Sequence, residues 1–304
     1  MTKSVKEWKS HTEQLTLLKQ RGLHITHETK ALYSLKTIGY YRLSGYLYPF
    51  RAKNIDGTKL DTFLPNSHFE DVKQLYIFDK KLRNLALDAL ERIEIALRAD
   101  IAYTLGKIDP LAHLQTTYFH SKFNHANWVE KYHQLVTRES QTAFIKHHLA
   151  HYVDIPIWVA CEVWDFGTMS KLYEGMDARY NDKIAKRYGL KDGSHLATHL
   201  RGLNFIRNVS AHHGRLWNRN IIGRASLKGF VGNVEPQWQL LSVNQVFVYF
   251  CLMQRMLKVI CPTSTWGQRF LDLLFTEFPK VNNGAVRLED LGLTTDLTSW
   301  QLWQ

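Results

Sequence analysis

Residues 68–105 read HFEDVKQLYIFDKKLRNLALDALERIEIALRADIAYTL. Apolar residues recur along this stretch every three or four positions, with charged residues between them; they are Leu75, Phe78, Leu82, Leu85, Leu90, Ile93, Leu97 and Ile101. This spacing places the apolar side chains on one face of a helix that ends at Gly106. Glu94 and Arg98 are four residues apart, so we expect them to form an ion pair. The stretch therefore predicts a helical fold.

Shorter helical patterns lie on both sides of this stretch. They cover residues 9–20, 128–136, 142–149, 182–188, 244–260 and 265–278, with two further helices capped by Thr26 and by Ser194. Gly167 predicts a tight turn before a helix that ends near Met176, and Gly214 predicts a helix stop. Residues 53–59 predict an irregular or hairpin-like connector. Because no alternation of strands and helices is present, we expect a mostly α protein built as a helical bundle.

The same patterns suggest three segments. Residues 1–66 form a small amino-terminal helical extension, residues 67–280 form the main helical domain with helical and loop insertions, and residues 281–304 form a carboxy-terminal tail. The extension is too short for us to expect it to fold alone.

The chain is strongly basic. Lys and Arg number 39 against 28 Asp and Glu, which gives a net charge of +11 and favours a polyanionic partner such as RNA. The three cysteines, Cys161, Cys251 and Cys261, are far apart, which argues against a disulfide framework or a zinc knuckle. The sequence shows no signal peptide and no apolar run of membrane-spanning length, so we expect a cytoplasmic protein that does not bind a membrane.

The stretch RNVSAHHGRLWNR, residues 207–219, carries the chemistry. An arginine offers a planar set of donors that suits a phosphate or a developing oxyanion, and a histidine can move a proton near neutral pH. Arg207, Asn208 and His212 form an R-N-x-x-x-H element, and His213 is a second candidate histidine. In-line attack on an RNA phosphodiester needs stabilisation of the phosphate charge and transfer of a proton, and these two groups can supply both without a metal. A solvated basic helix face is the structural alternative.

The helical spacing of this element has a consequence for assembly. Asn208 and His212 are four residues apart and share a face, whereas Arg207 projects about 140° from His212 on an ideal helix. One copy therefore does not align the arginine with the histidine. A kink near the helix end would correct this, and so would a second copy across a two-fold axis, which leads us to expect a homodimer.

Other histidine and aromatic clusters have simpler explanations. His195 and His199 have the i,i+4 spacing of a two-ligand metal site, and His147, His148 and His151 form another cluster, but a polar surface explains both. The segment from Tyr40 to Tyr46 interleaves aromatic residues with Arg42. It suits either a packed corner or a clamp on a single strand, and packing is favoured.

Several stretches together resemble a known family. They are RNVSAHHGRLWNR, LLKQRGL followed by IGYYRLSGY, IFDKKLRNLALDALERIEIALR, and IPIWVACEVWDFGTMSKLY. In their order along the chain, in which RNVSAHHGRLWNR comes last, they resemble the abortive-infection proteins of the AbiD/AbiF type in the HEPN superfamily, over about residues 8–278. The tail departs from the family pattern. The resemblance implies an α-helical HEPN-like fold, a dimer, a role in phage defence and, for some members, a small antitoxin RNA partner.

Three functional hypotheses follow. The first is a metal-independent endoribonuclease toxin with Arg207, Asn208 and His212 as catalytic residues, which leaves 2′,3′-cyclic phosphate and 5′-hydroxyl ends. The second is a non-catalytic protein that holds a structured RNA, and the third is a metal-dependent hydrolase that uses His195 and His199. For the first two we expect RNA as partner and neither cofactor nor metal; the RNA-binding candidates are Arg201, Arg215, Arg219, Tyr41 and Arg42.

Overall fold

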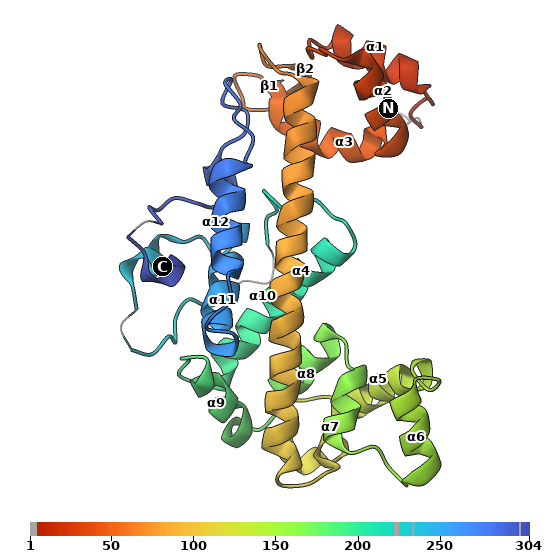
Figure 1. The fold of residues 1–304 in the computed structure, drawn as a ribbon, viewed down its shortest axis with the longest axis vertical. Coiled ribbons are helices and arrows are strands. Elements are labelled where there is room, and N and C mark those ends of the chain that lie inside the picture. Colours follow the sequence, from red (N-terminus) through yellow and green to blue (C-terminus); the bar gives the residue numbers. More distant parts are fainter. Residues whose placement is uncertain (1–4, 222–224, 233, 298) are drawn as a thin grey trace. The chain divides into compact units, whose positions relative to one another are not determined.

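The computed structural model describes residues 5–221, 225–232, 234–297 and 299–304, and the fold is mostly α (Figure 1). The chain forms two compact units. Unit 1 consists of residues 1–82 and 270–291, and unit 2 consists of residues 83–269 and 292–304. The long helix α4, Phe69–Gly106, has its first part in unit 1 and the rest in unit 2. It confirms the helix predicted from residues 68–105.

Unit 1 begins with three short helices and a hairpin (Figure 1). They are α1 (His11–Gln20), α2 (Glu28–Thr37), α3 (Tyr40–Leu47), the 3-10 turn η1 (Tyr48–Phe50), β1 (Arg51–Lys53) and β2 (Lys59–Phe63). Ser10 and Glu13 form a reciprocal capping box at the start of α1. The two strands are antiparallel, which confirms the predicted hairpin.

The core of unit 1 contains a buried polar contact. The Tyr46 hydroxyl donates a 2.6 Å hydrogen bond to the Asp79 carboxylate, and both residues are almost completely buried. Such a pair is stable because each polar group satisfies the other away from water. Phe278, which follows α12 (Trp266–Thr276), packs edge-on against Phe78 of α4, with ring centroids 5.0 Å apart. The 3-10 turn η6 (Leu288–Asp290) also belongs to this unit.

Unit 2 holds the remaining helices. They are α5 (His125–Arg138), α6 (Ala143–His151), α7 (Ile157–Ala160), α8 (Phe166–Gly175), α9 (Ala178–Arg187), α10 (Gly193–Ala211) and α11 (Val246–Ile260), with the 3-10 turns η2 (Ala112–Leu114), η3 (Thr116–Tyr118), η4 (Cys161–Val163), η5 (Pro236–Leu240) and η7 (Gln301–Trp303). Helix α10 packs against α8, α9 and α11, and α5 packs against α8. The tail returns to this core, because the Trp300 side chain is fully buried and lies edge-on to Trp238 at 5.2 Å.

Three local predictions need correction. Gly167 lies inside α8 and not at a turn, because the Asp165 carboxylate accepts a 2.6 Å hydrogen bond from the Thr168 N–H and starts the helix before it. Helix α2 follows His27 and not Thr26. Helix α10 is capped by Asp192 and not by Ser194. The Asp192 carboxylate accepts hydrogen bonds from the backbone N–H groups of Ser194 and His195.

The length and hydropathy of a helix determine whether it could cross a membrane. In the described parts of the chain, none of the helices combines the length and the apolar character that crossing a membrane requires.

Two buried histidines predict how stability depends on pH. Burial lowers the pKa of His113 and of His199 to about 4 in each case. An unfolded histidine has a pKa of about 6.5, so below that pH the unfolded chain binds protons that the folded chain does not. We therefore expect the free energy of unfolding to fall as the pH drops from 6.5 to 5, by up to about 1.4 kcal/mol per pH unit for each histidine.

Urea unfolding at a series of pH values measures this slope. His199→Gln keeps a donor toward the Ser226 carbonyl but does not titrate, so its slope between pH 6.5 and 5 should be shallower by up to one proton. Equal slopes for both proteins would contradict the assignment.

Candidate functional site

Helix α10 carries the arginine–histidine element. Its amino end is fixed by Asp192, whose side chain accepts hydrogen bonds from the Ser194 hydroxyl at 2.6 Å and the His195 ring at 2.7 Å. The Ser194 bond contributes most to a pKa of about 2 for Asp192. One face of the helix is completely buried; its apolar members are Leu196, Leu200, Leu203 and Ile206. The buried face leaves Asn208 exposed on another side, so the helix presents the element from a packed support.

The carboxyl end of α10 is a tight reversal of the backbone. His212 caps the helix, and His213 adopts a left-handed conformation with φ of 57°. The Gly214 N–H donates to the Val209 carbonyl at 2.8 Å, and the His213 N–H donates to the Ser210 carbonyl at 3.1 Å. These two bonds form a Schellman motif. The predicted stop at Gly214 is therefore displaced, because the histidine occupies the position that glycine usually takes.

The chain beyond the reversal does not continue the helix. Leu216 and Trp217 are fully buried, and the Arg83 guanidinium donates to the Gly214 carbonyl at 3.3 Å. The Arg219 guanidinium lies 5.8 Å from the Phe205 ring centroid, so it folds back over α10 in a cation–π contact.

Arg207 is half-buried among charged groups of α4 and α8. Its guanidinium donates a 3.4 Å hydrogen bond to the Asn208 amide oxygen. Burial raises the pKa of Glu94, and the positive charges of Arg98 and Arg207 oppose this rise. Burial also acts to raise the pKa of Asp165, but hydrogen bonds from Thr168 and the charges of Lys131 and Arg207 outweigh it and lower the pKa. Arg207 therefore lies near enough to two carboxylates for its charge to favour their ionised forms.

The sequence indicated part of this cluster and missed the rest. The Glu94–Arg98 ion pair is present, as the four-residue spacing predicted. Arg98 also donates to the carbonyls of Glu162 and Trp164. Nothing local connects Glu94 or Asp165 with Arg207, since they lie far apart in the chain, so their proximity was not predicted.

The polar residues of the element are accessible. Asn208, His212 and His213 are exposed, whereas Arg207 is half-buried. Because α10 is helical through Ala211, the ideal spacing of about 140° between Arg207 and His212 applies to this end of the helix. One chain thus holds the arginine beside the carboxylates and the histidine on a different side.

The other residues predicted to bind RNA lie in several places. Arg201 is on α10 and forms a 2.8 Å ion pair with Glu174 of α8. Arg215 follows the reversal and is half-buried. Tyr41 and Arg42 are on α3 in unit 1; the Tyr41 side chain is 92% exposed, so the expectation that it packs into a corner is wrong. Tyr46 of the same segment is buried and does pack.

The remaining histidines have protein partners. His195 bonds to Asp192, and buried His199 bonds through Nε2 to the Ser226 carbonyl at 2.7 Å. His147 and His151 stack with ring centroids 4.4 Å apart. Among the described residues, no group of three or more His, Cys, Asp or Glu side chains is placed to hold a metal ion.

The left-handed histidine predicts a stabilising substitution. An L-residue in this conformation is strained by roughly 1–2 kcal/mol, and glycine is not. We expect His213→Gly to raise the free energy of unfolding by about 0.5–1 kcal/mol, because it removes strain and keeps the Schellman bonds. Thermal unfolding measures this, with His213→Ala as the control that retains the strain. A lower melting temperature for His213→Gly than for His213→Ala would contradict the strain.

Comparison with known proteins identifies one family. The family model described as "Abi-like protein" matches residues 33–218, which is more than half of the chain and includes the whole R-N-x-x-x-H element, Arg207 to His212. The comparisons with curated proteins and with solved structures gave no significant match.

Proposed function

The chain belongs to the Abi-like protein family, and from that premise we propose that it is an abortive-infection protein that cleaves RNA without a metal. Membership of the family supports a role in abortive infection, the defence against phage. The proposal that the protein is a HEPN-type endoribonuclease adds to this role a specific chemistry, for which the element at the end of α10 is the support.

One observation carries this proposal. The exposed His212 and Asn208 occupy the carboxyl end of a packed helix, and the charge of Arg207 on the same helix end acts on the carboxylates of Glu94 and Asp165. The end of this one helix thus carries a candidate general base, an amide and a guanidinium, the groups that acid–base catalysis at a phosphodiester uses. His213 remains the second candidate for the base.

The chemistry balances with these groups alone. His212 takes the proton of a ribose 2′-hydroxyl, and the resulting oxygen attacks the adjacent phosphorus. Arg207 stabilises the additional negative charge on the phosphate oxygens. The bond from phosphorus to the 5′-oxygen breaks, and that oxygen takes up a proton from a histidine. The products are a 2′,3′-cyclic phosphate and a 5′-hydroxyl end.

We propose that the active form is a homodimer. Arg207 and His212 of one chain project about 140° apart, so a single copy does not direct both at one phosphate. A two-fold axis near the ends of two α10 helices would place the arginine of one protomer beside the histidine of the other.

The alternative is a protein that holds RNA without cutting it. The net charge of +11 supports this alternative, because phosphate contacts alone give strong binding. In this case a structured small RNA is the partner that we propose.

Substitution separates catalysis from binding. In buffer that contains EDTA, we expect the wild-type protein to cleave labelled RNA. His212→Ala should lower the cleavage rate by at least about a hundredfold, because general acid–base catalysis contributes a factor of about 10²–10⁴ to a rate. The affinity of this variant for RNA should remain nearly unchanged. Arg207→Ala should weaken both, since a phosphate clamp acts before and during the reaction.

His213→Ala is the matched control and should be milder. Loss of cleavage in His213→Ala with a tolerated His212→Ala would move the acid–base role by one residue. Binding without cleavage by the wild type would support the alternative, and activity that EDTA abolishes would support a metal-dependent enzyme.

Mixing two inactive variants tests the shared site. Arg207→Ala and His212→Ala alone should each lose most of the cleavage activity, but a mixture refolded or incubated together should regain part of it. The reason is that a mixed dimer retains one Arg207 and one His212 across the axis. Ribonuclease assays measure the recovery, and light scattering reports the dimer. A monomer by light scattering in the presence of RNA, with no recovery, would rule out the shared site.

A further inference from the structure

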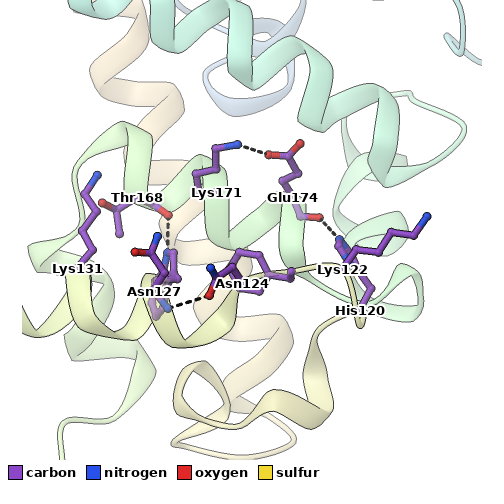
Figure 2. A pocket seen from close by; sticks show the side chains of 10 residues that line it. His120, Lys122, Asn124, Asn127, Lys131, Thr168, Lys171 and Glu174 are labelled. Atoms are coloured by element: carbon purple, nitrogen blue, oxygen red, sulfur yellow. Dashed lines mark hydrogen bonds and ion pairs between the residues drawn. The ribbon is translucent and has the colours of Figure 1, made fainter.

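A polar cavity of about 520 Å³ lies between α5 and α8 in unit 2 (Figure 2). Three lysines, two asparagines and a phenylalanine are the lining residues that matter for its chemistry; they are Lys122, Lys131, Lys171, Asn124, Asn127 and Phe123. The volume lies within the range of small-ligand sites. None of these residues belongs to the arginine–histidine element.

The charge around the cavity is positive. Glu174 is the acidic residue of the lining, and it is held by Lys171 and Arg201, each at 2.8 Å. Lys131 lies 4.0 Å from Asp165, and Lys122 is exposed at the opposite end of the cavity in Figure 2. The lining itself carries three lysines and one carboxylate, which leaves a net charge of +2 for an anionic ligand.

The cavity also offers an aromatic ring in a fixed position. The Phe123 ring lies directly against the backbone of α8 at Gly175, where a Cβ would be only 2.4 Å from the ring. Any side chain at this position would displace Phe123. The ring also contacts the rings of Phe119, His120 and His125, whose centroids lie 5.3, 6.3 and 6.1 Å away, and it is half-buried, so a base can contact only the part of the ring that remains exposed.

Two amides complete the lining. Asn124 caps α5, and its amide oxygen accepts a 3.2 Å hydrogen bond from the Asn127 N–H, which fixes that side chain. The Asn127 side chain is exposed on the first turn of α5 and lies next to Asn124 in Figure 2. Amides supply both donors and acceptors, the combination that recognises the edge of an unstacked base.

Arg201 connects this cavity with the element on α10. By the 100° step of an ideal helix, Arg201, Asn208 and His212 fall within about 40° of one another. The rise from Arg201 to His212 is about 16 Å, a distance that a few nucleotides of an extended single strand cover. Arg201 forms an ion pair with Glu174, which lines the cavity. The exposed side of α10 therefore carries the element at its carboxyl end and contacts the rim of the cavity at Arg201.

We infer that this cavity binds one nucleotide of the RNA strand, a few positions away from the phosphate that the element contacts. The lysines bind the phosphate of that nucleotide, Phe123 stacks on its base, and Asn124 and Asn127 contact the base edge. This inference rests on the proposed function for the presence of RNA at the element. It adds a subsite that gives the protein a preference for sequence and for strand length.

Binding measurements in His212→Ala protein test this subsite. Fluorescence anisotropy follows a labelled ten-nucleotide single-stranded RNA that the variant does not cut. Lys122→Glu, Phe123→Ala and Asn127→Ala should each weaken its binding, Phe123→Ala by about tenfold, as loss of one stacked base would. Lys146→Glu is the matched charge control, because Lys146 is exposed on α6 outside the cavity, and it should change the affinity less than Lys122→Glu.

Strand length distinguishes the subsite from a general charge effect. A labelled dinucleotide held at the element is too short to reach the cavity, so Lys122→Glu and Lys146→Glu should affect its binding equally. Asn127→Ala should also change the order of affinity among oligomers of the four bases, and circular dichroism should show that this exposed helical position tolerates alanine.

The outcomes separate this inference from the proposed function. Cleavage by the wild type with no effect of the cavity substitutions on the ten-nucleotide RNA would overturn the subsite and leave the catalysis intact. Weaker binding by the cavity variants with no cleavage by the wild type would leave the subsite intact and overturn the catalysis. Binding of nucleoside 5′-monophosphates that the cavity substitutions abolish, with unchanged RNA affinity, would assign the cavity to a free nucleotide and overturn the RNA subsite.

Discussion

The close approach of α11 to α10 at Gly202 is the contact on which unit 2 depends. A Cβ at this position would lie 2.1 Å from a ring carbon of Tyr249, so the ring rests on the bare backbone of α10. The Tyr249 hydroxyl then donates to the Val243 carbonyl at 3.1 Å. Since α10 also packs against α8 and α9, a larger residue here would shift the helix that carries Arg207 and His212 relative to its neighbours.

The electrostatic setting of the element follows from that packing. Arg207 projects toward α4 and α8, where Glu94 and Asp165 are partly desolvated and gain from a nearby cation. These carboxylates partly offset the positive charge of Arg207.

Local patterns in the sequence predicted most of the helices. They could not predict contacts between residues that are far apart in the chain. The apolar repeat of α4 and the Glu94–Arg98 spacing predicted what is present, because both depend on neighbours along one helix. Gly167 was interpreted as a turn since glycine disfavours helices, yet the Asp165 cap outweighs this preference by satisfying a free N–H.

The candidate site was predictable only in its local part. The spacing of Arg207, Asn208 and His212 was visible in the sequence, and the exposed end of α10 was not. The left-handed His213 escaped prediction because the adjacent Gly214 has a far stronger intrinsic preference for that conformation. Glu94, Asp165 and the cavity lined by residues 120–131 and 168–174 depend on tertiary packing, for which a single sequence has no local signal.

Helix α4 has a thermodynamic consequence for the whole chain. It supplies Leu75 and Phe78 to the core of unit 1, and Ile93 and Leu97 to the core of unit 2, without an interruption between them. If one unit unfolded alone, part of α4 would lose its packing and its apolar stripe would face water, and helix propensity alone would not hold that part together. Local unfolding of one unit is therefore linked to unfolding of the other through this shared helix. The amide protons in the middle of α4 should exchange with solvent only when the more stable of the two units unfolds.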